Sequence, residues 1–408
     1  MPDSLAGKRL LIVEEALGDF VGHWYEYVKS VAELSRVEGA AITIAGHAAA
    51  TPALREELDV LPAFEKTPWN GDYFHRLAPI RKLGLVRHNW LVFGRMRALL
   101  RREGPFDCTF VPTVVVHHIW AWRVLLRLYP RRIGRLVLLI RNNAASYAPG
   151  SSEPQFNSAA RLFGRALRAL ATQIASGQVV IATDSDRLAE EYRQLCGVKP
   201  VVFPSPRVAA PAAARASKGK SGPLLFSCLG PARFEKGIDV LQQAIALVLA
   251  QGDVPIRFAV QWPSPISDEA GQPYPPDAAL AESGLVDFLT EPLSSEAYDA
   301  LLASTDCMVL PYRRSSYFAR ISGVAVEAVT GGIPVIATAD TWTSELVETS
   351  GAGIAVPDGD AQALAEAMTA MALEYPRYRT LAEARRNQAL AAHSGEGFIN
   401  LLWGRETP

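Results

Sequence analysis

Residues Ser315–Pro334 read SSYFARISGVAVEAVTGGIP. An apolar run, Cys307–Tyr312, precedes this stretch and another, Pro334–Thr338, follows it, so the pattern predicts strand, loop, short helix and strand. Glu327 lies within the predicted helix. Because open α/β sheets bind ligands in the loops that follow their strands, this stretch predicts both a fold class and a site.

The same alternation of short apolar runs and helix-length amphipathic segments fills the chain of 408 residues, which is typical of βαβ units and parallel sheets. The predicted strands are Lys8–Glu15, Ala41–Gly46, Asp107–Thr113, Arg135–Arg141, Gln178–Thr183, Pro200–Phe203, Leu224–Leu229, Ile256–Trp262, Val286–Thr290, Cys307–Tyr312, Pro334–Ala339 and Gly353–Val356. The predicted helices include Gly22–Val37, Phe156–Ala175, Asp186–Cys196, Gly237–Leu249, Ser294–Ser304 and Ala361–Leu373.

One segment interrupts this alternation and divides the chain. Residues 204–223 read PSPRVAAPAAARASKGKSGP and show no periodicity, as expected of a linker. We therefore predict an α/β protein of two tandem doubly wound, Rossmann-like domains that face a cleft: residues 1–205, a linker at 206–222, and residues 223–389. The tail is helical in pattern, and its apolar end predicts that residues 390–408 cross back to the N-terminal domain.

Charge is distributed unevenly. The first 205 residues hold 26 Lys and Arg against 19 Asp and Glu, whereas the remainder holds 15 against 23. Residues 76–102 contain eight of the basic residues and no acidic one, interleaved with apolar side chains. Such a surface suits an anionic membrane face or a lipid-linked substrate, and the alternative is a solvated helix pair that covers the sheet. Nucleic-acid binding is not predicted, because no recognition motif accompanies the charge.

Other features of composition narrow the class of protein. There is no charged-then-apolar leader at Met1 and no apolar run of the roughly 20 residues that span a bilayer, so we expect a cytoplasmic protein, with a peripheral position on the membrane as a further expectation. The cysteines, which are far apart and include no C-x-x-C pair, are expected to be buried free thiols: Cys108, Cys196, Cys228 and Cys307.

The first candidate site is the turn Gly230–Gly237, GPARFEKG, between the first predicted strand and helix of the C-terminal half. A turn of this kind exposes backbone N–H groups at a helix start and favours an anion. Arg233 and Lys236 would add two full positive charges, a guanidinium fork and a compact ammonium. The alternative is a turn with solvated basic residues. It is not a Walker loop, since G-x-x-x-x-G-K-S/T is absent.

The second candidate site is the start of the helix in Ser315–Pro334. The N–H groups of Ser322 and Gly323 could meet a phosphate with Arg320 nearby, and Glu327 could accept hydrogen bonds from the vicinal hydroxyls of a ribose. The alternatives are an N-cap for Ser322 and a surface carboxylate for Glu327.

In their order and spacing these motifs resemble the family 4 glycosyltransferases of the GT-B fold. The resemblance covers roughly residues 224–373 and rests on G-x-x-R-x-E-K-G at 230–237, S-G-x-x-x-E-A at 322–328, G-x-P-V at 332–335, Glu345, Gly351-Ala352-Gly353 and Asp360. The N-terminal half matches in general layout alone.

The resemblance implies an enzyme that moves a sugar from a nucleotide-diphosphate donor to a hydroxyl of a glycan or lipid-linked acceptor, with retention at the anomeric carbon, in polysaccharide or glycoconjugate synthesis. By position, Arg233 and Lys236 would neutralise the diphosphate and Glu327 would bind the ribose. No metal or other cofactor is implied. The family commonly has a second glutamate eight residues before the helix glutamate, where this chain has Ala319.

The N-terminal half offers fewer candidates. The loop after its first strand supplies Asp19, Gly22 and His23, of which His23 is the candidate for the chemical step and the other two for the acceptor side. Thr113 and Arg141, each at the end of a predicted strand, are further acceptor-side candidates.

Two D-x-D sequences, Asp184-Ser185-Asp186 and Asp358-Gly359-Asp360, mimic a metal-binding motif, but both lie between a strand and a helix and are expected to cap helices. Other functions with a similar fold are a sugar-nucleotide epimerase, a phosphorylase and a non-catalytic nucleotide-sugar binding protein. A dehydrogenase fits least, because no G-x-G-x-x-G follows the first strand.

Overall fold

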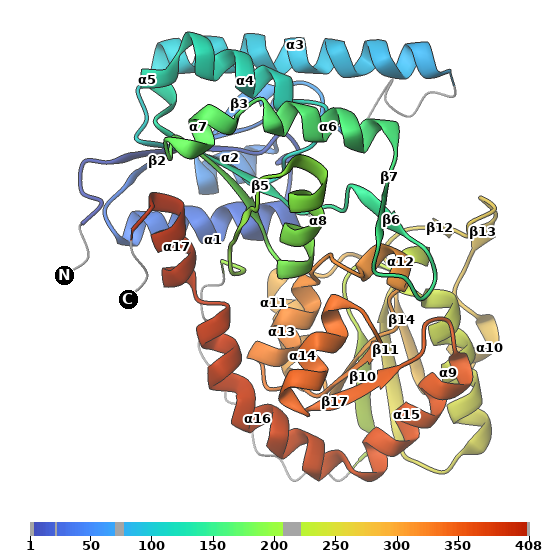
Figure 1. The fold of residues 1–408 in the computed structure, drawn as a ribbon. Helices are drawn as coiled ribbons and strands as arrows, with labels where there is room; N and C mark the ends of the chain where they lie inside the picture. Colours follow the sequence, from blue (N-terminus) through green and yellow to red (C-terminus); the bar gives the residue numbers. More distant parts are fainter. Residues whose placement is uncertain (1–3, 21–22, 70–76, 207–221, 406–408) are drawn as a thin grey trace. The chain divides into compact units, whose positions relative to one another are not determined.

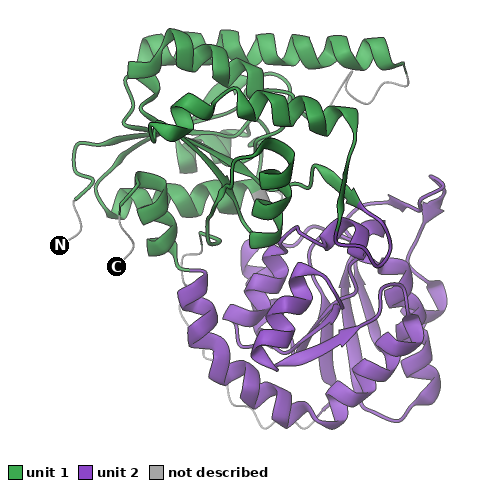
Figure 2. Cartoon of the chain, in the orientation of Figure 1, with its two compact units in different colours: residues 1–146, 153–208, 394–408 green, residues 147–152, 209–393 purple. Residues whose placement is uncertain are grey.

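The computed structural model describes residues 4–20, 23–69, 77–206 and 222–405. The chain forms two compact α/β units (Figures 1 and 2). Unit 1 comprises residues 1–146, 153–208 and 394–408, and unit 2 comprises residues 147–152 and 209–393. Each unit contains one large parallel sheet with helices on its faces, so the predicted pair of Rossmann-like domains is confirmed.

Unit 1 has a seven-stranded sheet in the order β3-β2-β1-β4-β5-β8-β9, in which all neighbours run parallel. Its strands are β1 (Arg9–Val13), β2 (Ala41–His47), β3 (Val60–Phe64), β4 (Cys108–Val111), β5 (Arg135–Ile140), β8 (Val179–Thr183) and β9 (Val201–Val202). The chain builds outward from β1 to β3 and then returns to β4 on the other side of β1. The boundary between β1 and β4 is therefore the topological switch point of this sheet.

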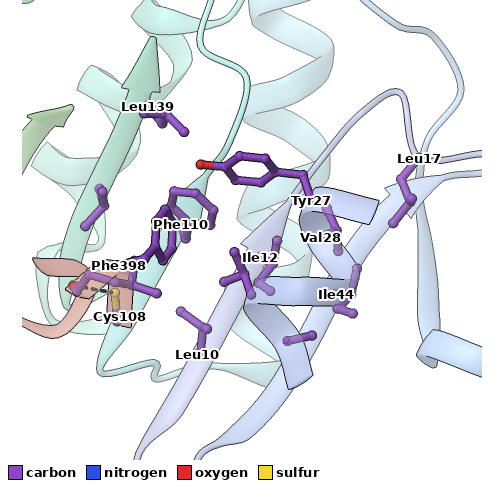
Figure 3. Packing of buried hydrophobic residues seen from close by; sticks show 14 of the residues in the cluster. Leu10, Ile12, Leu17, Tyr27, Val28, Ile44, Cys108, Phe110, Leu139 and Phe398 are labelled. Atoms are coloured by element: carbon purple, nitrogen blue, oxygen red, sulfur yellow. Dashed lines mark hydrogen bonds between the residues drawn. The ribbon is translucent and has the colours of Figure 1, made fainter. Parts of the chain in front are cut away.

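The helices of unit 1 are α1 (His23–Val37), α2 (Pro52–Leu58), α3 (Ala78–Glu103), α4 (Ile119–Leu128), α5 (Pro130–Ile133), α6 (Ser158–Arg168), α7 (Ala171–Ala175), α8 (Asp186–Cys196) and α17 (Gly395–Trp403). Helix α17 packs against α1 and β4, and its Phe398 is fully buried, with its ring centre 6.0 Å from that of Tyr27 and 5.7 Å from that of Phe110 (Figure 3). The end of the chain thus completes the core of unit 1, as its apolar pattern predicts.

Unit 2 has a six-stranded parallel sheet in the order β14-β11-β10-β15-β16-β17. Its strands are β10 (Leu224–Cys228), β11 (Ile256–Gln261), β14 (Val286–Leu289), β15 (Cys307–Leu310), β16 (Val335–Thr338) and β17 (Gly353–Val356). Here the switch point lies between β10 and β15. The loops that follow these two strands are the two candidate sites of the C-terminal half.

The helices of unit 2 are α9 (Ile238–Gln251), α10 (Ala278–Glu282), α11 (Ser295–Ser304), α12 (Arg314–Tyr317), α13 (Gly323–Thr330), α14 (Trp342–Ser350), α15 (Ala361–Leu373) and α16 (Tyr375–Ala392). Two separate apolar clusters, one containing Phe226 and Phe258 and the other Leu310 and Val326, pack around the sheet. Every strand of the sheet contributes at least one buried residue to these clusters.

Several predicted boundaries differ from the structure. Residues 76–102 were expected to form a helix pair in the solvated alternative, but α3 is one continuous helix of 26 residues. The predicted helix Phe156–Ala175 is divided into α6 and α7, and the tail is divided into α16 and α17 at Ser394, whose hydroxyl caps α17. The sequence pattern also missed β3, at the edge of the sheet, and the short hairpins β6-β7 (Ala145–Tyr147, Pro154–Phe156) and β12-β13 (Ile266–Ser267, Pro273–Tyr274).

The predicted linker, residues 206–222, lies outside the described residues except for its two ends. A short piece of the N-terminal half, residues 147–152, belongs to unit 2. Its attachment is specific: the Arg314 guanidinium donates to the carbonyl oxygens of Ala148 and Ser151 at 3.3 and 2.8 Å, and the Tyr147 and Phe318 rings lie 4.4 Å apart. No helix among the described residues combines the length and the apolar character needed to cross a bilayer.

Candidate functional site

The turn after β10 is held in a conformation that requires glycine at both ends. Gly230 has φ +78° and donates its N–H to Gln261 Oε1 at 2.6 Å. Gly237 has φ +65°, and a Cβ atom there would lie 1.9 Å from the carbonyl oxygen of Pro311. Left-handed backbone and the absence of space both select glycine. The turn is consequently pinned to β11 on one side and to the end of β15 on the other.

Lys236 is the last residue of the short 3₁₀ turn Phe234–Lys236, and it is buried. Its Nζ atom lies 5.7 Å from the centre of the Tyr312 ring, and Tyr312 is fully buried. Burial lowers the pKa of Lys236 to about 8, with the positive charges of Arg233 and Arg320 acting in the same direction. In the described part of the chain no carboxylate lies within ion-pair distance of this ammonium group. A buried cation of this kind is stabilised by an added anion.

The two candidate motifs meet at Gly230. A Cβ atom at this position would lie 2.8 Å from Lys236 Nζ and 3.2 Å from Val324 Cγ2. Val324 belongs to the first turn of α13, which follows β15. The structure therefore brings the turn Gly230–Gly237 and the start of α13 together at the switch point of unit 2.

Arg233 and Arg320 both lie close to the carboxylate of Glu235. Glu235 Oε1 lies 3.5 Å from Arg233 Nη1 and 3.2 Å from Arg320 Nη2. The Arg233 side chain is half exposed, whereas Arg320 is more buried and its guanidinium lies 4.7 Å from the centre of the Tyr317 ring. With Lys236, this corner brings together three basic side chains around the Glu235 carboxylate, so its local charge favours an anionic ligand.

At the start of helix α13, Ser322 has the capping role that was the alternative to phosphate binding. Ser322 is the N-cap, and its Oγ accepts from the N–H of Ala325 at 3.2 Å. Gly323 is the first helical residue and is exposed. Glu327 lies one turn later and is half-buried, and the Tyr298 hydroxyl on α11 donates to its Oε2. That contact holds one carboxylate oxygen of Glu327 in place. An ionised carboxylate can accept hydrogen bonds at both of its oxygens.

The loop between β15 and α13 is anchored by arginines. Arg314 forms a two-point ion pair with Asp340, from Nε and Nη2 at 2.6 Å each, and its backbone N–H donates to Asp358. Arg313 pairs with Asp239 on α9. Ala319, which stands where the family commonly has a glutamate, is completely buried. The loop is thus attached to α9 and to the segments that follow β16 and β17, and Ala319 is buried within it.

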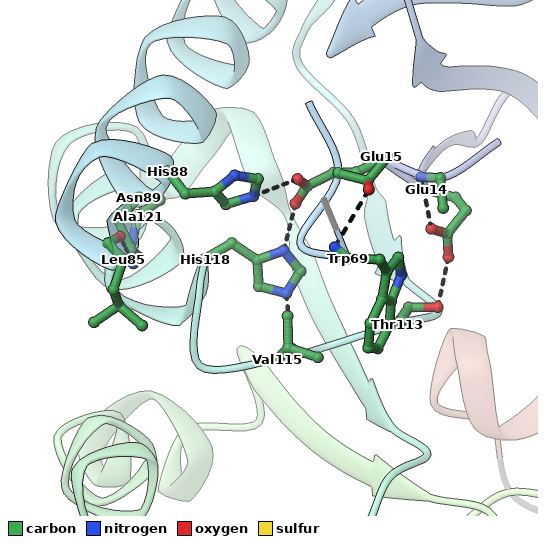
Figure 4. Close-up of polar contacts among 12 residues, drawn as sticks. Glu14, Glu15, Trp69, Leu85, His88, Asn89, Thr113, Val115, His118 and Ala121 are labelled. Atoms are coloured by element: carbon green, nitrogen blue, oxygen red, sulfur yellow. Dashed lines mark hydrogen bonds and ion pairs between the residues drawn. The ribbon is translucent and has the colours of Figure 1, made fainter. Parts of the chain in front are cut away.

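In unit 1, two of the predicted acceptor-side residues lie at the carboxyl edge of the sheet. The Thr113 hydroxyl, after β4, donates to Glu14 Oε2, after β1, at 2.6 Å (Figure 4). Arg141, after β5, lies with its Nε 3.5 Å from Asp184 Oδ2, after β8. The Arg141 guanidinium also stacks over Tyr27 at 4.5 Å from the ring centre.

The remaining predicted residues of unit 1 are Asp19, Gly22 and His23. Asp19 is exposed in the loop after β1, and Gly22 lies outside the described residues. His23 is the first residue of α1, and its side chain lies outside the described part of the structure.

Sequence reasoning missed a buried ionisable cluster beside Thr113. Glu15 accepts from His118 Nδ1 at 2.5 Å and from His88 Nε2 at 2.6 Å, and all three side chains are buried (Figure 4). Burial alone would raise the pKa of Glu15, but His118 and His88 outweigh it and lower the pKa to about 2. The backbone N–H of Val115 donates to His118 Nε2 at 3.1 Å, which leaves the Nδ1 proton facing Glu15.

The neighbouring carboxyl group, Glu14, behaves in the opposite way. Burial raises the pKa of Glu14 to about 7, although the hydrogen bonds from Thr113 and Ala16 and the charge of Arg141 favour its ionised form. The sequence did contain a signal: two consecutive acids form the end of the first predicted strand, at the sheet edge where ligands bind.

The two D-x-D sequences act structurally. Ser185, between the two aspartates of the first, caps α8, and Asp360 of the second caps α15, as expected of residues before helices. Asp184 faces Arg141 instead. Within the described ranges, no three His, Cys, Asp or Glu side chains are grouped so as to hold a metal ion. The cysteines are free and buried, as predicted.

Comparison with known proteins agrees with this arrangement. Residues 224–373 match the family described as "Glycosyl transferases group 1", which spans both candidate motifs of unit 2. No curated protein matches the chain by sequence.

Solved structures resemble the whole chain in fold. Sucrose-phosphate synthase from Thermosynechococcus elongatus is 15% identical with a TM-score of 0.63, and the match covers 97% of both chains. Anabaena HepE in complex with UDP is 15% identical with a TM-score of 0.62, over 97% of this chain and 98% of that one. HepE in complex with UDP-glucose is also 15% identical, with a TM-score of 0.60 over the same shares.

Residues 224–373 thus match the group 1 glycosyltransferase family, and the chain as a whole shares the two-domain fold of these solved structures.

Proposed function

We propose that the protein is a retaining glycosyltransferase that takes a sugar from a nucleotide-diphosphate donor bound by unit 2 and transfers it to a hydroxyl of a glycan or lipid-linked acceptor, in polysaccharide or glycoconjugate synthesis. The observation that carries the proposal is Lys236, a buried ammonium group at the sheet switch point, beside the left-handed Gly230 and the first turn of α13. A diphosphate supplies the negative charge that this group lacks.

In the reaction, the bond between the anomeric carbon and the diphosphate oxygen breaks, and the electron pair leaves with the diphosphate. The acceptor oxygen forms the new bond to the same carbon, and its proton passes to the departing diphosphate. Negative charge therefore grows on the leaving group as the reaction proceeds. Lys236 and Arg233, fixed beside it, stabilise the transition state more than the ground state. The step needs no metal ion or other cofactor.

The nucleoside end of the donor belongs to α13 in this proposal. Glu327 accepts hydrogen bonds from the two ribose hydroxyls, and Tyr298 holds its carboxylate in place through Oε2. Ser322 is committed to capping α13, so its contribution to the donor comes from the backbone at the helix start, together with Gly323. Arg320 forms an ion pair with Glu235, so in this proposal part of its positive charge is already balanced before the donor binds.

Ala319 distinguishes this donor site from the usual family pattern. Alanine has no carboxylate, so this position gives the donor sugar no charged contact, and the methyl group is completely buried. A non-catalytic protein that binds a nucleotide sugar is the second candidate function on this ground. Turnover separates the two, since a binding protein would gain thermal stability from the nucleotide sugar without consuming it.

We also propose that the protein works in the cytoplasm, at the inner face of a membrane, through helix α3. The outward side chains Leu83, Val86 and Trp90 are 67, 63 and 72% exposed. The exposed residues around them include Arg81, Lys82, Arg87, Arg97 and Arg101, and residues 77–102 contain no acidic residue. A long helix with apolar and basic side chains on its exposed face is suited to an anionic lipid surface.

The donor proposal is tested by thermal-shift measurements against nucleotides and nucleotide sugars, followed by incubation of the best ligand with candidate acceptors. NMR of the product assigns the anomeric configuration. Stabilisation by a nucleoside diphosphate and a product of unchanged configuration support the proposal. An inverted product would reject retention, and the absence of any nucleotide effect would reject the donor site.

The membrane proposal is tested separately by flotation with vesicles of phosphatidylcholine, with and without phosphatidylglycerol. We expect flotation with the anionic vesicles at low salt, and its loss in a variant with Leu83→Ser and Trp90→Ser. Val124→Ser, on the exposed part of α4, is the matched control. Failure of the wild-type protein to float at low salt would contradict the membrane proposal and leave the donor site unaffected.

A further inference from the structure

A short piece of the N-terminal half of the chain, Tyr147–Ser152, belongs to unit 2 rather than to unit 1 (Figure 2). We refer to this segment as the strap. It forms the tip of the β6-β7 hairpin: the chain leaves unit 1 after Ser146 and returns to it at Glu153. The donor chemistry does not use the strap, so its attachment to unit 2 needs another explanation.

The segment that leads into the strap is fixed within unit 1. The backbone N–H groups of Ala144 and Ala145 both donate to Glu191 Oε1, at 2.6 and 3.1 Å, and Glu191 is a buried residue of α8. The Tyr192 hydroxyl, from the same helix, donates to the carbonyl oxygen of Asn142 at 3.1 Å. The strap is therefore a short link with an anchored base rather than a loose loop.

The guanidinium of Arg314 holds the tip of the strap in unit 2. It donates to the carbonyl oxygens of Ala148 and Ser151 at 3.3 and 2.8 Å, and from Nε to Asp340 Oδ2 at 2.6 Å. Arg314 is buried, so these acceptors take the place of water around its charge. The planar fork of arginine serves several acceptors at once, which the single ammonium group of lysine does less well.

The backbone of Asp340 is strained where it meets Arg314. Asp340 has φ +53°, and among the described residues the other residue with a side chain and a positive φ is Asp59. Asp59 is the C-cap of α2, where a left-handed residue is common. Asp340 follows β16 and precedes Thr341, the N-cap of α14, so no helix end accounts for its conformation. Strain of this kind persists where the surroundings impose it, and the Arg314 ion pair supplies that constraint.

The strap also packs against the loop that leads to α13. The Tyr147 and Phe318 rings, both buried, lie 4.4 Å apart, and the Arg314 guanidinium lies 4.7 Å from the centre of the Phe318 ring. Two residues after Phe318 comes Arg320, whose Nη2 lies 3.2 Å from Glu235 in the turn Gly230–Gly237. A displacement of the strap would therefore displace the segment that carries Arg320.

We propose that the strap is a positioning device for the donor site. Through Tyr147 and Arg314 it holds the loop 312–322 in the conformation that receives the nucleotide, and it thereby makes donor binding depend on unit 1. The proposal rests on the proposed function for the identity of the ligand. Tyr147 and Arg314 are positioning residues, since neither has to touch the donor. A loop that is already ordered loses less conformational freedom when its ligand binds, which is the source of the gain in affinity.

The proposal makes strap docking and nucleotide binding reciprocal. If docking favours binding, binding favours docking by the same factor. Amide hydrogen exchange of the full-length protein measures docking at residues 144–152 and order in the loop at residues 312–322. UDP, GDP and ADP are the probes, and the one that binds wild type most tightly is used. We expect it to slow exchange in the strap as well as in the loop.

The first variant lies in the strap and is examined without any ligand. Tyr147→Ala removes the ring that contacts Phe318 and should speed exchange in the loop 312–322, far from the substitution in sequence. Tyr147→Phe keeps the ring and should restore slow exchange. Because no nucleotide is present, this result does not depend on the donor proposal.

The second variant, Arg314→Lys, keeps a positive charge near Asp340 but loses the fork that grips the strap. It should speed exchange at residues 144–152, weaken nucleotide binding by at least about fivefold, the lower end of typical coupling between sites, and abolish the slowing of strap exchange by the nucleotide. Titration calorimetry measures the affinity.

The matched control is Arg132→Lys in unit 1. Arg132 Nη1 also donates to backbone carbonyl oxygens, those of Leu100 and Arg101 at 2.9 and 3.3 Å. The same substitution there should leave exchange in the strap and the loop, and nucleotide affinity, as in wild type. Exchange in β10 and β11 reports on the sheet of unit 2 and should be unchanged in every variant.

The proposal is overturned if Tyr147→Ala leaves exchange in the loop 312–322 unchanged, or if a nucleotide binds wild type without slowing exchange in the strap. Wild-type nucleotide affinity in Arg314→Lys would also overturn it. So would faster exchange of β10 and β11 in both variants, because the effect would then be a general loss of stability. If none of the three nucleotides binds, the donor proposal fails, and the ligand-free exchange of Tyr147→Ala still decides whether the strap orders the loop.

Discussion

Gly230 and Lys236 are packed so closely that a Cβ atom on the glycine would lie 2.8 Å from the lysine Nζ. The glycine is the first residue of the turn after β10, and the lysine returns to it after six residues. Their contact fixes the position of a buried positive charge at the switch point of unit 2.

Replacement of Gly230 by alanine should abolish nucleotide binding. The methyl group would displace Lys236 Nζ and approach Val324 Cγ2 to 3.2 Å, and the φ of +78° would strain the new residue by roughly 1–3 kcal/mol. Isothermal titration with UDP and urea unfolding measure the two effects. Gly252→Ala is the matched control, because it has φ +67° and open space around it. It should lose stability but keep nucleotide affinity.

Nucleotide binding should take up protons near pH 8 to 9. The pKa of Lys236 is lowered to about 8, so part of the lysine population is neutral in the free protein at this pH. A bound diphosphate favours the charged form and raises the pKa, which draws a proton from solution. Calorimetry in buffers of different ionisation enthalpy measures the uptake. Lys236→Met should show none, and uptake of equal size in that variant would contradict the assignment.

The ribose contact predicts discrimination between nucleotides. If Glu327 accepts from two vicinal hydroxyls, UDP should bind wild type more tightly than 2′-deoxy-UDP by on the order of tenfold, the value of one hydrogen bond to a charged group. Glu327→Ala should bind both with similar, weaker affinity. Tyr298→Phe, which loses the hydroxyl that holds Glu327, should reduce the discrimination less. Undiminished discrimination in Glu327→Ala would place the ribose elsewhere.

Glu15 should stabilise unit 1 at neutral pH and lose this effect in acid. Its pKa is lowered to about 2 from the ordinary 4.5, so the unfolded chain binds the proton more readily than the folded one. The stabilisation is complete above pH 4.5, is lost as the pH falls towards 2, and amounts to roughly 3 kcal/mol.

Urea unfolding of wild type and Glu15→Gln, at pH 7 and again below pH 4, measures this difference. The two proteins should differ most at pH 7 and approach each other in acid. The surface carboxyl Glu65 provides the control variant, Glu65→Gln, since its side chain is 62% exposed. A constant difference between wild type and Glu15→Gln at all pH values would show that the residue acts through packing.

Much of the architecture could be predicted from the sequence because parallel strands in doubly wound sheets are short, apolar and regularly spaced. Helix α8 and strand β17 have the predicted bounds. Edge strand β3, VLPAF, escaped because it contains a proline and has only two buried residues. The break between α16 and α17 also escaped, since the amphipathic pattern continues across the Ser394 cap.

The candidate site of unit 2 was predictable because its residues are contiguous in two short motifs. Two details were not. The pairing of Arg233 and Arg320 with Glu235 depends on side-chain directions in a turn, and the Tyr298 contact with Glu327 joins positions 29 residues apart. Neither leaves a periodic trace in the sequence.

The site of unit 1 was predicted least well. Thr113 and Arg141 were identified as ends of strands, but Glu14 was counted as part of the first strand rather than as the group that follows it. The tie from Glu15 to His88 and His118 spans 73 and 103 residues and depends on how α3 and α4 pack. Long-range contacts of this kind follow from tertiary structure rather than from local pattern.

The central claim, that unit 2 holds a nucleotide diphosphate against Lys236, is tested most directly by titrating UDP and other nucleoside diphosphates into wild type and Lys236→Met at pH 7. We predict that at least one binds wild type, and that the variant, while still folded, loses affinity by on the order of tenfold to a hundredfold, as expected for a charge-assisted contact. Equal affinity of wild type and Lys236→Met for that nucleotide would contradict the claim.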